Sequence, residues 1–167
     1  MCLSGRGQTS NLMRTMDFNA IRRTASLWLG PLGEPEFIDE DELDGAVADG
    51  VLLWDIRSSD AHTAWHPTGA RSLGQVDWLL DEHSGANLVP SNVIASALAR
   101  IGIRPGRDVI VYAGHEPVPA FIAVRALRAI GISHARICFC EDDHDHDGDA
   151  VVLARRLTLA TRARATA

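Results

Sequence analysis

Val51-Leu52-Leu53-Trp54-Asp55 is an unbroken apolar run that ends at a carboxylate. A run of the same kind follows at 108–113, with the sequence Asp-Val-Ile-Val-Tyr-Ala. Strands covered on both faces are apolar at nearly every position, whereas strands with one wet face alternate. Both runs are therefore predicted to be central strands of a sheet that is covered on both sides. Arg136–Cys140 is predicted to be a third strand.

Helical segments separate these runs. Apolar residues recur with helical spacing in the segment 92–101, which follows Ser91 as its expected cap. Further helices are predicted over 18–29, 40–48, 58–64 and 120–130. Strands that alternate with helices are typically parallel and joined by right-handed crossovers. We therefore expect an α/β fold of three layers, with a mostly parallel five-stranded sheet and helices on both faces.

The composition is that of an ordinary globular domain. The chain has 167 residues, 46% of them hydrophobic and 23% charged, and its formal net charge is −6. A negative charge argues against nucleic acid as a partner. Acidic clusters at 34–44 and 141–149, and a basic stretch at 155–164, are expected to be solvated. No apolar run approaches the roughly 18 residues of a membrane span, so no membrane partner is expected.

The cysteines indicate a reduced protein. Cys2, Cys138 and Cys140 are too few and too unevenly spaced for a disulfide framework. The apolar stretch after Arg22-Arg23 is too short for an export signal. We therefore expect a cytoplasmic location, and the sequence leaves the oligomeric state open.

Composition also divides the chain into three parts. Residues 1–35 are expected to be an N-terminal extension that is partly disordered, 36–155 a globular domain, and 156–167 a basic C-terminal tail. Segments 1–15 and 142–148 have few apolar anchors and are predicted to be the most mobile.

Residues 53–70 carry the first part of a resemblance to a known family. Their sequence is Leu-Trp-Asp-Ile-Arg-Ser-Ser-Asp-Ala-His-Thr-Ala-Trp-His-Pro-Thr-Gly-Ala. It resembles the rhodanese motif, in which a strand ends in Asp-x-Arg and an acidic–aromatic helix leads to Gly-His-Ile-Pro-Gly-Ala. The matching residues are Asp55, Arg57, His66, Gly69 and Ala70, and the departures are Trp65, Pro67 and Thr68.

A second part follows in the order and spacing that the rhodanese pattern requires. A helix ends at Ile101-Gly102, a strand ends at Val111-Tyr112, and a further helix ends at Ile130-Gly131. Together the two parts extend over about residues 36–155, so the resemblance implies one rhodanese-like domain over that range.

Rhodaneses transfer a sulfane sulfur through a cysteine thiolate at the end of a strand. The resemblance places that nucleophile at Ala113, which has no nucleophilic atom. In the loop that follows, Pro117 and Pro119 lack an N–H and Glu116 is negative, which disfavours an anionic sulfur donor. We therefore expect a rhodanese-like module that is non-catalytic.

That module is expected to bind another protein or a small anion through the remodelled loop. The ligand-binding candidates are Gly114, His115, Glu116, Val118 and Arg57. A structural role is expected for Asp55, His66 and Gly69. No cofactor is expected.

Two alternatives stay open. An active sulfurtransferase would use Cys138 or Cys140 as a displaced carrier, because both lie near the carboxyl edge of the expected sheet. The competing explanation is that each cysteine is a small packed side chain. His144 and His146 are weak metal-ligand candidates, since Asp-His-Asp-His lacks the spacing of a structural zinc site.

Overall fold

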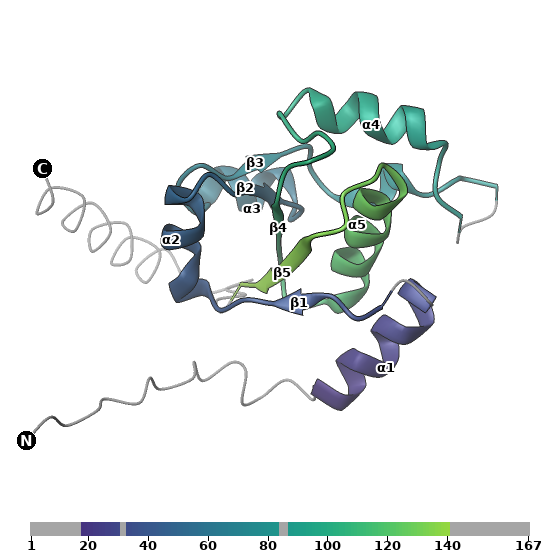
Figure 1. Ribbon diagram of the computed structural model, residues 1–167, viewed down its shortest axis with the longest axis horizontal. Helices are drawn as coiled ribbons and strands as arrows, with labels where there is room; N and C mark the ends of the chain where they lie inside the picture. The colour runs from purple at the N-terminus through teal and green to yellow at the C-terminus, as the bar shows by residue number, and fades with distance from the viewer. Residues whose placement is uncertain (1–17, 31–32, 84–86, 141–167) are drawn as a thin grey trace, which may run out of the picture.

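The computed structural model describes residues 18–30, 33–83 and 87–140. Its strands are β1 (Glu36–Phe37), β2 (Leu52–Asp55), β3 (Arg71–Ser72), β4 (Val109–Ala113) and β5 (Ala135–Phe139). They form one sheet in the order β1-β5-β4-β2-β3, and every pairing is parallel (Figure 1). The predicted α/β fold is confirmed. The two apolar runs lie in the interior of the sheet, with β4 at its centre and β2 beside it.

Helices connect the strands, and several of their starts differ from the prediction. The helices are α1 (Phe18–Leu29), α2 (Leu43–Ala48), α3 (Ser59–Ala64), α4 (Ser91–Ala99) and α5 (Pro117–Ala129), with 3₁₀ helices η2 (Glu40–Glu42) and η3 (Val76–Leu79). Ser91 is the first residue of α4 and not its cap, which is Pro90. Helix α5 begins at Pro117 and not at Ala120. A proline in the first helical turn loses no hydrogen bond, so the helix extends back through both prolines.

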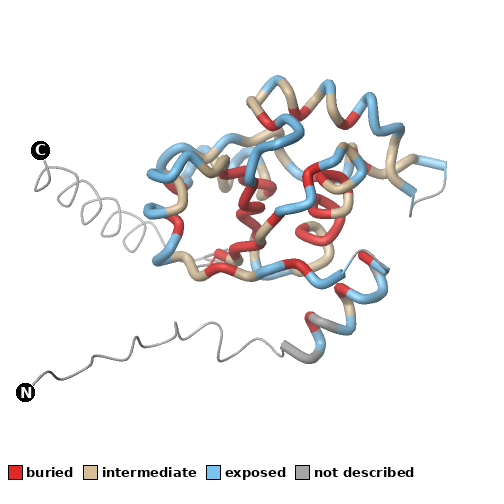
Figure 2. The backbone as a smooth tube through the Cα atoms, in the orientation of Figure 1, coloured by how far each residue is buried: buried red, intermediate tan, exposed pale blue. Residues whose placement is uncertain are grey.

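Successive side chains of β4 point to opposite faces of the sheet. Val109, Val111 and Ala113 pack on the face covered by α1, α4 and α5. Ile110 and Tyr112 pack on the opposite face, which α2 covers. Buried residues are concentrated in the inner strands and in α5 (Figure 2). Burial on both faces is the reason that this run is continuously apolar.

Helix α1 packs against α5 (Figure 1). Ile21, Ala25 and Leu29 recur every fourth residue and are all buried in the larger hydrophobic core. Leu27 lies on another side of the helix and is 85% exposed. The apolar side of α1 thus contributes to the same core as α4 and α5.

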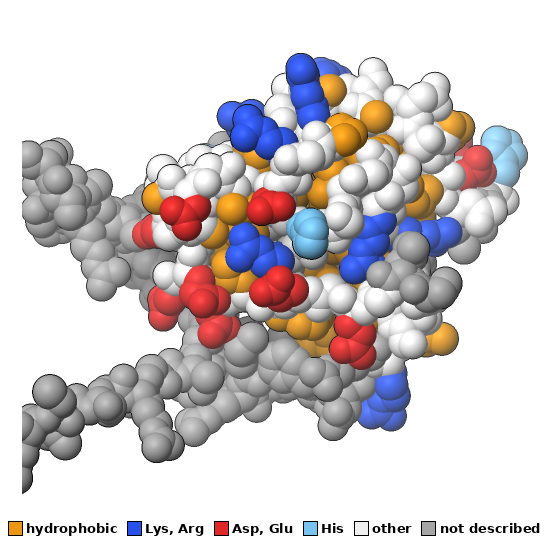
Figure 3. All heavy atoms as spheres, in the orientation of Figure 1, with side chains coloured by type: hydrophobic (Ala, Val, Ile, Leu, Met, Phe, Trp, Pro, Cys, Tyr) orange, Lys and Arg blue, Asp and Glu red, His pale blue; other side chains and the backbone are white. Residues whose placement is uncertain are grey.

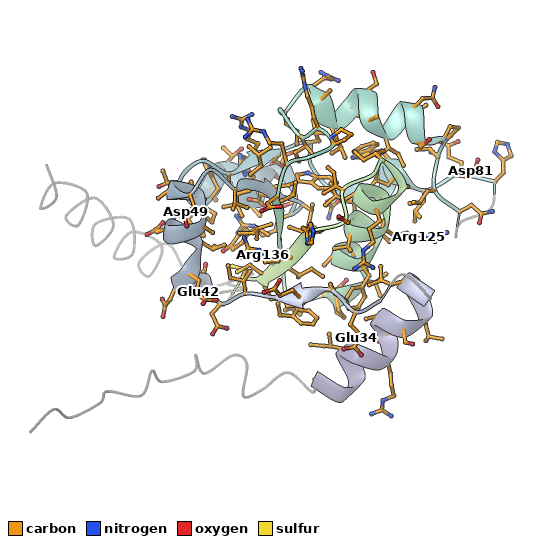
Figure 4. All side chains as sticks on the ribbon, viewed as in Figure 1. Glu34, Glu42, Asp49, Asp81, Arg125 and Arg136 are labelled. Atoms are coloured by element: carbon orange, nitrogen blue, oxygen red, sulfur yellow. The ribbon has the colours of Figure 1, made fainter. Side chains whose placement is uncertain are left out.

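Charged side chains of both signs share the surface. In Figure 3 acidic and basic groups are interspersed on the visible face. Figure 4 labels some of them in the same orientation, among them Glu34, Glu42, Arg125 and Arg136. Glu34 and Glu42 are exposed, as expected for the acidic cluster at 34–44.

Some predictions fall outside the described residues. These are the mobile segments 1–15 and 142–148, the tail 156–167, and the metal candidates His144 and His146. Within the described ranges, no helix is long and apolar enough to cross a membrane.

Candidate functional site

The carboxyl ends of β2, β4 and β5 meet at one edge of the sheet. The strand register places Asp55 beside Tyr112, and Tyr112 beside Cys138. Just past β5, the Cys140 amide donates a hydrogen bond of 2.7 Å to the Ala113 carbonyl. Ligands of parallel α/β folds bind at this edge, where loops follow the strands.

Asp55 is fully buried at this edge and is held by two cationic or polar partners. Arg57 binds it in a bidentate manner, with Nε donating to Oδ1 at 3.0 Å and Nη2 donating to Oδ2 at 2.8 Å. His62 Nδ1 lies 2.9 Å from the same Oδ2. A buried carboxylate needs such partners, so Asp55 joins the end of β2 to the segment that contains α3.

The remaining guanidinium hydrogens of Arg57 extend the network. Nη2 also donates to the Trp65 carbonyl at 2.7 Å, and Nη1 lies 4.0 Å from Cys140 Sγ. The guanidinium carbon lies 4.8 Å from the centre of the Tyr112 ring. Burial opposes the charge of the guanidinium, but hydrogen bonding and attraction to Asp55 outweigh it, so the pKa of Arg57 is raised. Arg57 is therefore a fixed cation beside a sulfur atom.

Tyr112 and Glu40 are members of this network that the sequence did not single out. The Tyr112 hydroxyl donates to Glu40 Oε1 at 2.6 Å across 72 residues of chain. Burial is the main cause that raises the pKa of Tyr112, and the nearby Cys140 and Glu40 raise it further. The sequence did contain one signal for this contact. Tyr112 lies in a strand predicted to be buried, and a buried hydroxyl needs a hydrogen-bond partner.

The residue that occupies the expected nucleophile position is on the opposite face. Ala113 is 1% exposed, and its methyl group packs in the core beneath α5. Among the loop candidates, His115 and Glu116 are exposed and Gly114 and Val118 are partly buried.

Arg57 and Ala113 lie on opposite faces of the sheet. Its guanidinium lies on the α2 side against the Tyr112 ring, whereas Ala113 faces α5. Glu116 is the N-cap residue of α5, and its side chain makes no capping hydrogen bond. The first turn of α5 lacks the N–H groups of Pro117 and Pro119, so it has few donors for an anion.

His66 and Gly69 lie in the turn after α3. His66 Nδ1 is 2.8 Å from the His62 carbonyl, and the two imidazoles stack with centroids 4.1 Å apart. The Ala70 amide donates to the Pro67 carbonyl at 3.0 Å, and Gly69 has a positive φ of 81°. A side chain at position 69 would also contact Val47 Cγ1 at 3.3 Å. Both residues thus shape the turn that leads into β3.

The two cysteines occupy different surroundings on the α2 face. Both are buried. Cys138 Sγ lies 3.8 Å from the carbonyl of Phe139, whereas Cys140 Sγ is next to Arg57 and Tyr112. No group of three or more His, Cys, Asp or Glu side chains suited to a metal occurs in the part of the chain that the structure describes.

The fold and the polar edge define a five-stranded parallel α/β domain. Comparison with known proteins found similar solved structures only. No family model matches the chain, and no curated protein does either.

Similar solved structures are those of EanB. A variant of EanB in complex with ergothioneine is 21% identical, has a TM-score of 0.51, and is matched over 70% of this chain and 27% of that one. A variant in complex with hercynine is 22% identical with a TM-score of 0.50, over 68% of this chain and 26% of that one. At this identity the likeness shows the fold alone, and the chain spans about a quarter of the length of EanB.

Proposed function

We propose that this chain is a rhodanese-like module that does not transfer sulfur at the family position and that binds a protein partner through the adjacent loop. The observation that carries the proposal is Ala113 at the end of β4. A methyl group can neither attack a sulfane sulfur nor carry one, and this one is packed in the core.

The start of α5 supports the same conclusion. A sulfur-donor anion needs a cradle of N–H groups, and the first helical turn lacks two of them at Pro117 and Pro119. Glu116 adds a negative charge beside it. These features favour a protein over a small anion as the ligand of this loop.

The exposed part of the loop offers a small contact surface. His115 and Glu116 are exposed between β4 and α5, and two well-packed elements hold the loop on either side. A loop held in this way loses little conformational entropy on binding. A partner surface with basic or neutral groups would complement Glu116.

A second candidate function is sulfur transfer through Cys140, and a specific observation favours Cys140 over Cys138. A thiolate at Cys140 would accept a hydrogen bond from the Arg57 guanidinium, 4.0 Å away, and cations of this kind lower the cost of forming a thiolate.

The chemistry of that candidate is simple, and burial weighs against it. The thiolate would bond to the sulfane sulfur of thiosulfate, and the sulfur–sulfur bond of the donor would break to release sulfite. One EanB structure contains a cysteine persulfide, which makes the fold likeness relevant to this candidate. However, Cys140 is only 3% exposed, and a donor must reach the sulfur to react.

Mass spectrometry after incubation with thiosulfate or 3-mercaptopyruvate distinguishes the two candidates. We expect no gain of a sulfur atom in the unmodified chain. Ala113→Cys is expected to gain little, because the donors that would acidify its thiol remain absent. A gain of one sulfur atom that is lost in Cys140→Ser and kept in Cys138→Ser would replace the first proposal with the second.

Binding is tested by a photo-crosslinking side chain in place of His115, with the exposed Val93 of α4 as the matched control position. A protein captured at 115 and not at 93 is then purified. We expect Glu116→Arg to weaken its affinity and Val93→Asp to leave it unchanged. Equal capture at both positions, or an affinity insensitive to Glu116→Arg, would contradict the proposed surface.

A further inference from the structure

Four exposed arginines form a basic corner around the segment that leads from α4 into β4. They are Arg71, Arg100, Arg104 and Arg107. Three of them belong to that segment, and Arg71 is the first residue of β3. The chain has a formal net charge of −6, yet it has no acidic residue from Ser91 to Arg107. The basic corner therefore differs in charge from the molecule as a whole.

The end of α4 holds one of these side chains in place. Arg71 Nη1 donates a hydrogen bond to the Ile101 carbonyl at 2.7 Å. The same guanidinium lies over Gly102, where a Cβ would overlap it. Arg100 is the C-cap residue of α4 and directly precedes Ile101, so Arg71 reaches the backbone from which Arg100 extends. Cationic groups stabilise the C-terminal end of a helix, so part of the role of Arg71 is structural.

A tight turn holds the other two arginines near each other. The Arg107 amide donates to the Arg104 carbonyl at 3.3 Å, and Gly106 has a positive φ of 82°. Pro105 and Gly106 are the two central residues, a pair typical of a type II turn. The α carbons at the two ends of such a turn are less than about 7 Å apart. The ring of Pro105 restricts the backbone further, so Arg104 and Arg107 start from fixed positions.

The charge of the basic corner is not neutralised within the described residues. None of the four guanidinium groups makes an ion pair there. Asp108 follows the turn directly, but it is exposed and does not pair with any of them. In Figure 3 basic side chains lie together at the top of the view, over the end of α4. Like charges that lie close together repel one another, and no contact in the described domain offsets this repulsion.

We propose that the basic corner binds an acidic segment of a protein partner, rich in Asp and Glu side chains. Guanidinium groups pair with carboxylates through two parallel hydrogen bonds. The turn and the end of α4 already fix the backbone, so little conformational entropy is lost on binding. Complementary charge also speeds the encounter with such a partner and disfavours basic ones.

Nucleic acid suits the basic corner less well than an acidic protein segment. Single strands are bound by stacking on aromatic side chains, and the segment from Ser91 to Arg107 contains no Phe, Tyr or Trp. Duplex binding uses many phosphate contacts, and the net negative charge of the chain opposes it.

This inference is independent of the proposed function. The turn at 104–107 precedes β4, whereas the loop that contains His115 follows it. The five residues of β4 separate the two by about 16 Å, at about 3.3 Å per residue. A partner can therefore occupy one surface while the other is free.

Fluorescence anisotropy of a labelled oligoglutamate peptide tests the basic corner. The basic stretch at 155–164 also attracts this peptide, so its four arginines are replaced by glutamine in the background chain. In that background we expect saturable binding that weakens as salt is added, because exposed charges are screened. Arg104→Gln combined with Arg107→Gln should weaken it about five- to tenfold, through the loss of two exposed charge contacts. The unfolding curve should not shift, since neither guanidinium has a partner among the described residues.

A matched control removes the same charge elsewhere. Arg23→Gln in α1 combined with Arg136→Gln in β5 should change the affinity for the peptide less than about twofold, because distant charges are screened. Backbone amide NMR then locates the contact. Added peptide should shift the resonances of residues 100–107 and leave those around His115 in place.

Three results would overturn the proposal. The first is a peptide that binds without shifting residues 100–107, or that does not bind the background chain at all. The second is an affinity that the double variant at 104 and 107 leaves unchanged. The third is a DNA strand of the same charge that binds the background chain more tightly than the peptide does, which would make the basic corner a nucleic-acid surface.

Discussion

Asp55 is the one charged residue that is fully buried in the described part of the chain, and it lies where three strands end. An isolated carboxylate at such a position would be strongly destabilising. It is tolerated because Arg57 matches both of its oxygens and His62 supplies a third contact. The ion pair thus fixes where the chain leaves β2.

Arg57→Leu should lower the free energy of unfolding by about 3–5 kcal/mol, because it leaves a buried carboxylate without its main partner. The measurement is urea denaturation followed by circular dichroism. The double variant Asp55→Asn with Arg57→Leu is the control, and it should lose less than the sum of the two single changes. Strict additivity would mean that the two side chains are not coupled.

Tyr112 gives a pH prediction at the same scale. Its pKa is raised in the folded chain, so the folded state keeps the phenol proton when the unfolded state releases it. The free energy of unfolding should therefore decrease above about pH 10, by up to about 1.4 kcal/mol per pH unit, and should be unaffected by this group at lower pH.

The amino-acid composition allows the ionisation of Tyr112 to be measured without interference from other tyrosines. The chain has a single tyrosine and no lysine, so phenolate absorbance reports Tyr112 alone. Phenolate should appear only as the protein unfolds. Tyr112→Phe retains both buried cysteines, and its alkaline loss of stability should be shallower. Phenolate formation near pH 10 in a protein that is still folded would contradict the buried environment.

At the scale of elements, three helices end in the same way. After α2, α4 and α5 a glycine with positive φ follows, and the next residue's amide bonds back to a carbonyl five residues earlier. The glycines are Gly50, Gly102 and Gly131. Each motif turns the chain and places an apolar residue directly after the glycine, buried in Ile103 and Ile132 and partly buried in Val51. The helix end and the following strand or loop are thus positioned together.

Gly102→Ala should destabilise the protein more than Gly131→Ala. Both glycines have φ above 80°, where an alanine costs about 1–2 kcal/mol. A Cβ at position 131 meets no atom within 4 Å, whereas one at 102 would overlap the Arg71 guanidinium. That group donates to the Ile101 carbonyl at 2.7 Å, and the contact would be lost. Thermal unfolding of both variants measures the difference, and equal losses would show that Arg71 moves aside without cost.

At the scale of the whole molecule, the larger hydrophobic core is built from α1 as well as from the helices between the strands. Ala25 is 1% exposed in the core, and it allows α1 to approach the rest of the domain closely. A larger or charged side chain there would separate the helix from α5 or bury a charge.

Ala25→Asp should therefore lower the free energy of unfolding by several kcal/mol, on the order of the loss from an unpaired buried charge. Leu27→Asp on the exposed side of the same helix is the control, and it should change stability by less than about 0.5 kcal/mol. Hydrogen exchange of α1 amides reports whether the helix detaches first. Equal effects of the two substitutions would show that α1 adds nothing to the core.

The central strands and α1 could be predicted from the sequence, because continuous apolar runs and a four-residue period are local signals. It could not locate β1 and β3, since strands of two residues have no period. Helix α5 began earlier than predicted because prolines stop a helix interior but suit its first turn. The contact between Glu40 and Tyr112 joins residues far apart in the chain, and no local pattern encodes such a pairing.

Ala113 and Cys140 share a backbone hydrogen bond, yet their side chains belong to opposite faces of the sheet. Substitutions that reshape the surroundings of one residue therefore leave the other largely untouched. The two faces of the sheet can therefore change independently of each other at this edge, one around the Ala113 methyl group and the other around the Cys140 thiol.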